Sequence, residues 1–119
     1  MRTAEDCLFC RIVAGSIPAD VVYEDDLTVA FRDIAPQAPT HVLVVPRDHI
    51  DHAGRIEARD AASVLAMITA AQKVADLEGI GGEDRGYRLV FNVGPDAQNS
   101  VPHLHLHVVG GRSLEWPPG

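Results

Sequence analysis

The sequence lacks any long apolar run and carries few basic residues. No uninterrupted apolar stretch approaches the roughly 20 residues that a membrane-spanning helix needs, and none follows the charged residues of the N-terminal MRTAEDC segment. We therefore expect no transmembrane helix, no secretory signal and a cytoplasmic location. Ten Lys and Arg residues stand against 17 Asp and Glu residues, which gives a formal net charge of −7. A general nucleic-acid-binding protein would carry a basic stripe instead.

The acidic balance is still compatible with a small phosphate-bearing ligand. Backbone N–H groups and imidazoles can hold one phosphate locally, whatever the sign of the global charge. The chain also lacks internal repeats and low-complexity tracts, and 46% of its 119 residues are hydrophobic. That length and composition predict one globular domain over residues 1–119.

Cysteine is scarce: the only two are Cys7 and Cys10, in a CxxC pattern. A structural disulfide is not expected in a cytoplasmic chain, and the βαβ context of a redox CxxC is absent. Three residues apart on a helix, the two thiols share one face. With two histidines such as His49 and His52 they would complete a four-ligand zinc site. The alternative is a pair of buried, reduced thiols.

Hydrophobic periodicity predicts an α+β fold. Helical spacing indicates one long helix over 58–78 and one short helix over 6–14, with Asp6 as its N-cap and Gly15 at its C-terminal end. The strands are short and two of their connections are hairpin-sized, so we expect a mostly antiparallel sheet with the long helix on one face. The predicted strands are 21–24, 28–32, 41–46, 87–93 and 103–109.

Three histidines alternate with apolar residues near the end of the chain, in the run HLHLHVVG. Alternation is the period of a β-strand, so His103, His105 and His107 should share one face, roughly 7 Å apart. Leu104 and Leu106 should then point into the core. Imidazole titrates near neutrality, binds metals and acts as a nucleophile. The row is therefore a candidate reactive surface, and the alternative is a solvated strand face.

The loop before these histidines is rich in polar and turn-forming residues. Polar side chains and free backbone N–H groups beside an imidazole row can hydrogen bond to phosphate oxygens. The candidate residues of this loop are Asn92, Gln98, Asn99 and Ser100. Ser100 is five residues before His105, so its hydroxyl could lie near the central imidazole. Ordinary turn chemistry is the alternative interpretation.

Three further residues have open interpretations. His41 begins a strand and, taken alone, is typical of a hydrogen-bonded core or edge histidine. Asp33 ends a strand where a loop starts, and it either accepts the hydroxyls of a ribose or caps a turn, with the turn favoured. Trp116 is the only tryptophan and lies in the WPPG tail, where an exposed indole often marks a contact with another chain.

Three segments together resemble the HINT branch of the histidine triad (HIT) superfamily, the histidine triad nucleotide-binding proteins. They are HLHLHVV, FRDIAPQAPTHVLVVPRDHI and the ending GGR…WPPG, and the likeness extends over roughly residues 7–119. The resemblance implies a single HIT domain whose five-stranded sheet continues across a homodimer. It also implies binding of purine nucleoside monophosphates and hydrolysis of nucleoside phosphoramidates, without nucleic acid or membrane as a partner.

The resemblance also assigns roles to residues. His105 would be the nucleophile that forms a nucleotidyl-histidine intermediate, His107 and His41 would assist it, and Ser100 would pass a proton to the leaving amine. Trp116 would reach toward the neighbouring subunit's site. The remaining nucleotide-binding residues implied are Phe9, Ile12, Ile17, Phe31, Asp33, Ile34, Leu43, Asn92 and Asn99.

Bacterial relatives of this branch bind a structural zinc ion. Mapped onto this chain, the resemblance implies Cys7, Cys10, His49 and His103 as the ligands. One departure concerns the loop, where the family usually has Gly-Gln-Ser or Gly-Gln-Thr and this chain has Gln98-Asn99-Ser100. Two alternatives stay open: a dinucleoside polyphosphate hydrolase, and a nucleotide-binding module with weak catalysis.

Overall fold

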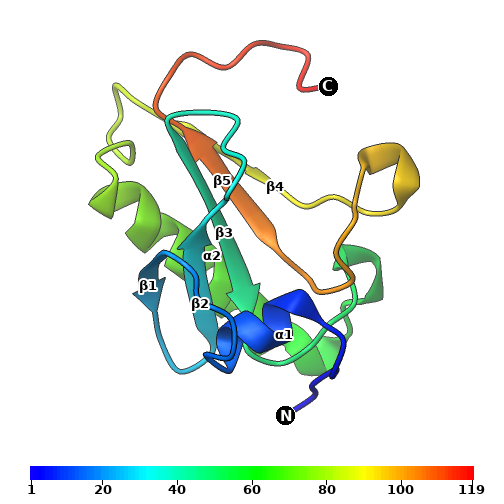
Figure 1. Ribbon diagram of the computed structural model, residues 1–119. Helices are drawn as coiled ribbons and strands as arrows, with labels where there is room; N and C mark the ends of the chain where they lie inside the picture. The colour runs from blue at the N-terminus through cyan, green and yellow to red at the C-terminus, as the bar shows by residue number, and fades with distance from the viewer.

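One antiparallel sheet of five strands organises the chain. The computed structural model describes residues 1–119, and the strands lie in the order β1-β2-β3-β5-β4 (Figure 1). All four strand pairings are antiparallel. The α+β class and the five-stranded sheet predicted from the sequence are confirmed. The strand bounds are Val21–Glu24 (β1), Thr28–Arg32 (β2), Thr40–Pro46 (β3), Tyr87–Val90 (β4) and Leu106–Gly110 (β5).

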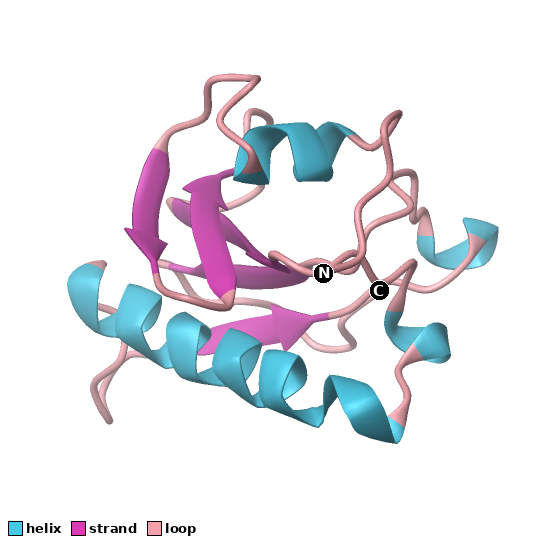
Figure 2. Cartoon of the chain, turned by 90° about the horizontal axis from the view of Figure 1, so that it is seen from below, coloured by secondary structure: helices cyan, strands magenta, loops and turns pink.

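Two helices cover opposite faces of this sheet, as Figure 2 shows. The short helix α1 spans Leu8–Val13 and the long helix α2 spans Ala61–Leu77. The larger core lies between α2 and the sheet, and the smaller core lies beneath α1. Three short 3-10 helices complete the fold: η1 (Ala53–Arg55), η2 (Ala58–Asp60) and η3 (Pro95–Ala97).

Strand β3 is the centre of both cores, and all seven of its residues are buried. Val42 and Val44 belong to the core on the α2 side, whereas Leu43 and Val45 belong to the core on the α1 side. A strand that is buried on both faces has a nearly continuous apolar sequence, which explains the run HVLVVP. Strands β2 and β5 pair with its two edges.

Both helices begin later than predicted. Residues 58–60 form η2, because the Asp60 carboxylate accepts the backbone N–H of Glu57 at 2.9 Å and also pairs with Arg2. The expected Asp6 cap is wrong: Cys7 is the N-cap of α1, and its Sγ accepts the backbone N–H of Cys10 at 3.3 Å. Gly15 has the expected positive φ, of 78°.

The last two strands are shorter than predicted. Strand β5 starts at Leu106, because the two preceding backbone N–H groups bond elsewhere. The Leu104 N–H donates to the Ile50 carbonyl, and the His103 N–H donates to the Val101 carbonyl at 2.9 Å. Strand β4 ends at Val90 rather than at residue 93. The predicted alternation nevertheless holds, since Leu104, Leu106 and Val108 all pack in the core on the α2 side. No helix in the structure has the length and apolarity required to span a bilayer.

We predict that Leu106→Ala destabilises the fold by about 2–5 kcal/mol, because Leu106 of β5 is fully buried in the core between the sheet and α2 and its truncation leaves a cavity. The measurement is urea unfolding followed by circular dichroism. The matched control is Leu65→Ala on the solvent face of α2, where the side chain is 67% exposed and the expected change is within about 0.5 kcal/mol. Equal effects of the two substitutions would contradict this description of the core.

Candidate active site and metal-binding cluster

A cleft of about 810 Å³ opens between α1, the ends of β2 and β3, and the loop that precedes β5. This volume suits a small molecule of nucleotide size. One wall is apolar and comes mainly from α1, β2 and β3. The other end is polar, and its lining residues are Asn92, Gln98, Ser100, His105 and His107.

His105 presents a free nitrogen at this polar end. Its Nδ1 lies 2.7 Å from the carbonyl oxygen of His103. A carbonyl only accepts hydrogen bonds, so Nδ1 carries a proton, and in the neutral ring Nε2 therefore keeps its lone pair. The ring stands edge-on to Phe9, with centroids 5.2 Å apart. A half-buried imidazole held in this tautomer is a competent nucleophile.

A series of hydrogen bonds through His41 fixes the orientation of the His107 ring next to His105. The backbone N–H of Gln37 donates to His41 Nδ1 at 3.0 Å, so His41 carries its proton on Nε2. That Nε2 lies 2.9 Å from His107 Nδ1 and 3.4 Å from the Asp33 carboxylate. His107 therefore accepts at Nδ1 and keeps its own proton on Nε2. Asn92 Nδ2 lies 3.4 Å from this Nε2. Both nitrogens carry hydrogens, so they do not bond each other and the Nε2–H is left available to a ligand.

Burial keeps His107 uncharged. Desolvation first, and then the neighbouring His105 and His41 imidazoles, lower the pKa of His107 to about 4. The neutral ring can donate one hydrogen bond from Nε2 without adding charge to the cleft.

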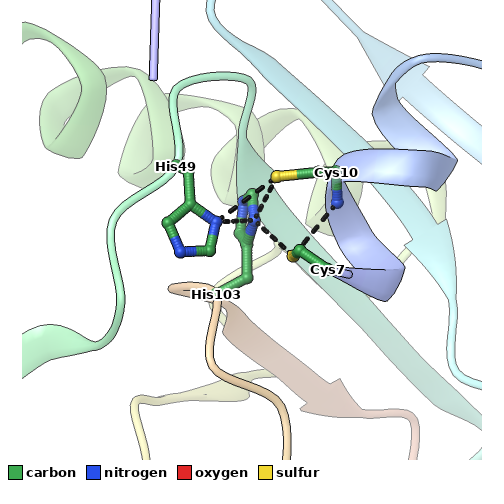
Figure 3. A group of neighbouring side chains, drawn as sticks. All are labelled: Cys7, Cys10, His49 and His103. Carbon is green, nitrogen blue, oxygen red and sulfur yellow. Dashed lines mark hydrogen bonds between the residues drawn. The ribbon is translucent and has the colours of Figure 1, made fainter. Parts of the chain in front are cut away.

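Four further ligand-type atoms converge beneath α1. Cys7 and Cys10 project from the start of α1, His49 from the loop after β3 and His103 from the segment before β5 (Figure 3). His103 Nδ1 lies 3.3 Å from Cys7 Sγ, 3.4 Å from Cys10 Sγ and 3.1 Å from His49 Nδ1. Cys10 Sγ lies 3.3 Å from His49 Nδ1. All four atoms fall within 4.8 Å of one another.

The surroundings of this cluster fit a metal ion. His103 Nε2 donates to the Pro46 carbonyl at 2.9 Å, and His49 Nε2 lies 2.9 Å from the Asp51 carboxylate. Both rings therefore turn an unprotonated Nδ1 inward, as metal-ligating histidines do. Tetrahedral zinc with two sulfur and two nitrogen ligands would separate the ligand atoms by about 3.3–3.8 Å. Burial raises the pKa of the Cys10 thiol, so a bound cation would have to favour the thiolate.

Comparison with known proteins identifies the family. The sequence profile of the HIT domain family matches residues 14–114. The chain belongs to the HIT domain family. An uncharacterized HIT-like protein of Synechococcus elongatus is 47% identical over 116 residues, which are 98% of this chain and 99% of that protein.

Solved structures of HIT proteins share the fold. A HIT family hydrolase from Legionella pneumophila is 48% identical, with a TM-score of 0.91 over 96% of this chain and 100% of that chain. A histidine triad protein from Clostridium difficile is 38% identical, with a TM-score of 0.88 over 95% of this chain and 96% of that chain. The residues that the HIT resemblance singled out can therefore be located in a fold shared by these structures.

Most of the residues implied for nucleotide binding lie along the cleft of this HIT protein. Asp33 lines it and also caps a turn, since its Oδ1 accepts the N–H of Ala35 at 2.8 Å. His41 is buried behind His107 rather than exposed to the cleft. The other implied residues that line the cleft are Phe9, Ile12, Ile17, Phe31, Ile34, Leu43, Asn92, Ser100, His105 and His107.

Asn99 and Trp116 do not line the cleft of their own chain, although only Asn99 was expected there, since the resemblance places Trp116 at the neighbouring subunit's site. Asn99 turns away from the cleft, and its Oδ1 is buried without a hydrogen-bond partner. Trp116 is 80% exposed, and the Arg88 guanidinium lies 5.7 Å from its ring centroid. His52, considered as a fourth metal ligand, instead caps η1 by accepting the N–H of Gly54.

Gln98 was among the polar loop residues that the sequence suggested for phosphate binding, but the resemblance gave it no role. It lines the cleft beside Ser100. Its left-handed backbone conformation could not be predicted, because glutamine is not typical of that conformation.

We predict that neutral, buried His107 makes stability depend on pH. The unfolded chain binds a proton at this residue below pH 6.5, but the folded chain does so only near pH 4, so stability is lost as the pH falls through this window. The loss is ~1 kcal/mol between pH 7 and pH 5, after allowance for partial solvation of the ring.

The measurement compares urea unfolding of the wild type and His107→Asn from pH 7 to pH 5. Both proteins share the Cys7–Cys10 cluster, so subtracting one curve from the other removes its contribution. The variant should lose less stability on acidification. Parallel curves of unfolding free energy against pH would show that the pKa of His107 does not differ between the folded and unfolded states.

Proposed function

We propose that this chain is a purine nucleotide-binding hydrolase of the HINT branch, which cleaves nucleoside phosphoramidates through a nucleotidyl-histidine at His105. The observation that supports this most is the unprotonated Nε2 of His105 at the polar end of an apolar-walled cleft. Solved neighbours described as HIT family hydrolases agree with hydrolysis in general. The nature of the bond cleaved is our proposal.

The cleft would hold the nucleotide with its base against the apolar wall. Aromatic and aliphatic side chains give a planar base dispersion contacts and remove it from water. Asp33 and Ile34 also line the cleft, and the Asp33 carboxylate lies 3.4 Å from His41 Nε2, so they are suited to the ribose. The base-binding residues would be Phe9, Ile12, Ile17, Phe31 and Leu43.

The α-phosphorus would then stand over His105. Its Nε2 lone pair forms a bond to phosphorus while the bond from phosphorus to the leaving nitrogen breaks. The leaving amine takes a proton from the Ser100 hydroxyl, because an unprotonated amide anion is too poor a leaving group. The imidazole becomes cationic, and its Nδ1–H stays bonded to the His103 carbonyl.

Water completes the reaction by attacking phosphorus. The bond to His105 breaks, nucleoside monophosphate is released and the imidazole regains its lone pair, while the proton that water loses restores the Ser100 hydroxyl. His107 would donate from Nε2 to a phosphate oxygen, and His41 would hold His107 in that tautomer. The net change is phosphoramidate plus water to amine plus nucleoside monophosphate.

Zinc is the metal that best fits the cluster under α1. Two thiolates and two imidazoles match its preferred donors, and all four positions are filled by protein, as in structural sites. Zinc bound to Cys7, Cys10, His49 and His103 would cross-link α1 to the segment that carries His105.

We also propose a homodimer in which the sheet continues through the free edge of β4. Arg88 of this strand contacts Trp116. The exposed tail would thereby lie near the dimer boundary and reach toward the neighbouring subunit's site.

We predict that His105→Asn lowers kcat on adenosine 5′-phosphoramidate by at least ~10³-fold, because it removes the nucleophile. The assay follows release of AMP, and intact-mass spectrometry of quenched wild type detects the nucleotidyl adduct. The control is His52→Asn, whose ring lies outside the cleft.

Undiminished turnover in His105→Asn would rule the mechanism out. A wild type that binds AMP but shows neither turnover nor adduct would favour a nucleotide-binding module. A wild type that cleaves dinucleoside polyphosphates faster than phosphoramidates would favour the other hydrolase class.

We predict about one zinc ion per chain by elemental analysis of protein purified without chelators. Cys10→Ser and His49→Asn should each lose most of this metal and lower the melting temperature, since the cross-link disappears. His52→Asn should keep the metal. A metal-free wild type would contradict the assignment.

A further inference from the structure

Gln98 adopts a backbone conformation that glycine would take without steric cost. It is the only non-glycine residue of the chain with a positive φ, at 60°, and its ψ is 35°. A side chain in this left-handed region clashes with its own backbone. The conformation ends η3: the Gln98 N–H bonds the Pro95 carbonyl at 2.9 Å, and the Asn99 N–H bonds the Gly94 carbonyl at 3.1 Å.

This turn decides which side chains face the cleft. Gln98 and Ser100 line it, whereas Asn99 between them does not. A strained residue in the wall of a binding site is a reason to look for a role of its side chain, because glycine would build the same turn more easily. The carboxamide of Gln98 is therefore the feature to be explained.

The exposure of the residues at the polar end indicates where Gln98 lies relative to the reacting phosphorus. His105, His107 and Asn92 are half-buried, whereas Gln98 and Ser100 are exposed. The imidazoles thus form the floor of the polar end, and the two exposed side chains form its rim. In an in-line displacement at phosphorus the leaving group departs on the side opposite the attacking atom. With His105 attacking from the floor, the leaving group points toward the rim.

We propose that Gln98 selects the leaving group, by hydrogen bonding to polar atoms that lie beyond the scissile nitrogen. This inference rests on the proposed function and concerns its leaving group: Gln98 would favour amines that carry a hydrogen-bonding group beyond the scissile nitrogen over unsubstituted ammonia. A carboxamide offers two N–H donors and one acceptor. The rim has no cationic side chain to compete, because Arg32, the one arginine of the cleft, pairs with Glu78 at 2.6 Å.

The test uses two probes that share the AMP moiety. One is adenosine 5′-phosphoramidate, which releases ammonia, and the other is the adenylyl phosphoramidate of glycine, which releases an amine bearing a carboxylate. The measured quantity is the ratio of kcat/KM for the glycine probe to kcat/KM for the unsubstituted probe. This ratio cancels effects on nucleotide binding and on the histidines.

We expect Gln98→Gly, which also relieves the strained backbone, to lower this ratio about fivefold through the lost hydrogen bond. Gln98→Glu should lower it further by repelling the carboxylate, and Gln98→Lys should raise it. The matched control is Ala97→Glu, which adds the same charge to the neighbouring exposed position outside the cleft and should leave the ratio unchanged. Melting temperatures verify that each variant folds.

Two failures are distinguishable. If the wild type cleaves both probes but the Gln98 variants have the wild-type ratio of kcat/KM values, the role of Gln98 is overturned and the proposed function stands. The same holds if Gln98→Glu changes this ratio no more than Ala97→Glu does. If the wild type cleaves neither probe, the proposed function fails and the leaving-group inference fails with it.

Discussion

His103 joins three parts of the structure through three different atoms, and the geometry of the site depends on it. Its Nε2 donates to the Pro46 carbonyl at the end of β3, its Nδ1 faces the two thiols under α1, and its own carbonyl accepts from His105. The residue is fully buried. Removing any one partner would leave a buried polar group unsatisfied, at a cost of about 1–3 kcal/mol. One residue thus fixes both the tautomer of His105 and the position of α1.

The polar end of the cleft would meet an anionic phosphate without a free lysine or arginine side chain. His107 has its pKa lowered to about 4 by burial, and Arg32 is engaged by Glu78. Oriented but uncharged donors stabilise developing negative charge without reorganising during the reaction. They also bind the anionic product less tightly than arginines would. This arrangement explains how a chain with a net charge of −7 can offer a phosphate site without a basic surface.

The sequence was informative where a periodic pattern had a single physical cause. The alternation over 103–109 placed the leucines and the histidines on opposite faces correctly, because burial on the α2 side selects every second residue. It did not predict that β5 starts only at Leu106. That start depends on Ile50, a residue more than fifty positions away, which takes the hydrogen bond of Leu104. Contacts of this kind have no local signature.

The same distinction applies to the site. Residue chemistry and the HIT resemblance pointed to Cys7, Cys10, His49 and His103, and these converge in space. Spacing alone could not choose between His49 and His52, because the choice depends on which ring faces α1 after folding. Asn99 was expected at the nucleotide but does not line the cleft, whereas Gln98 and Ser100 on either side of it do. The left-handed conformation of Gln98 has no signature in the sequence, because glutamine seldom adopts it.

The apolar wall and the reactive imidazole share one anchor, and this has a consequence for how the site is organised. Phe9 lies on α1 between the two cysteines, and its ring contacts both His103 and His105, with centroid separations of 6.0 and 5.2 Å. A six-residue helix is too short to be stable by itself. Its position must come from the Cys7 and Cys10 cluster and from the small core beneath it. In the proposed function, base recognition and the orientation of His105 would therefore not be independent, because a change that loosens the cluster would move Phe9 and release His103 together.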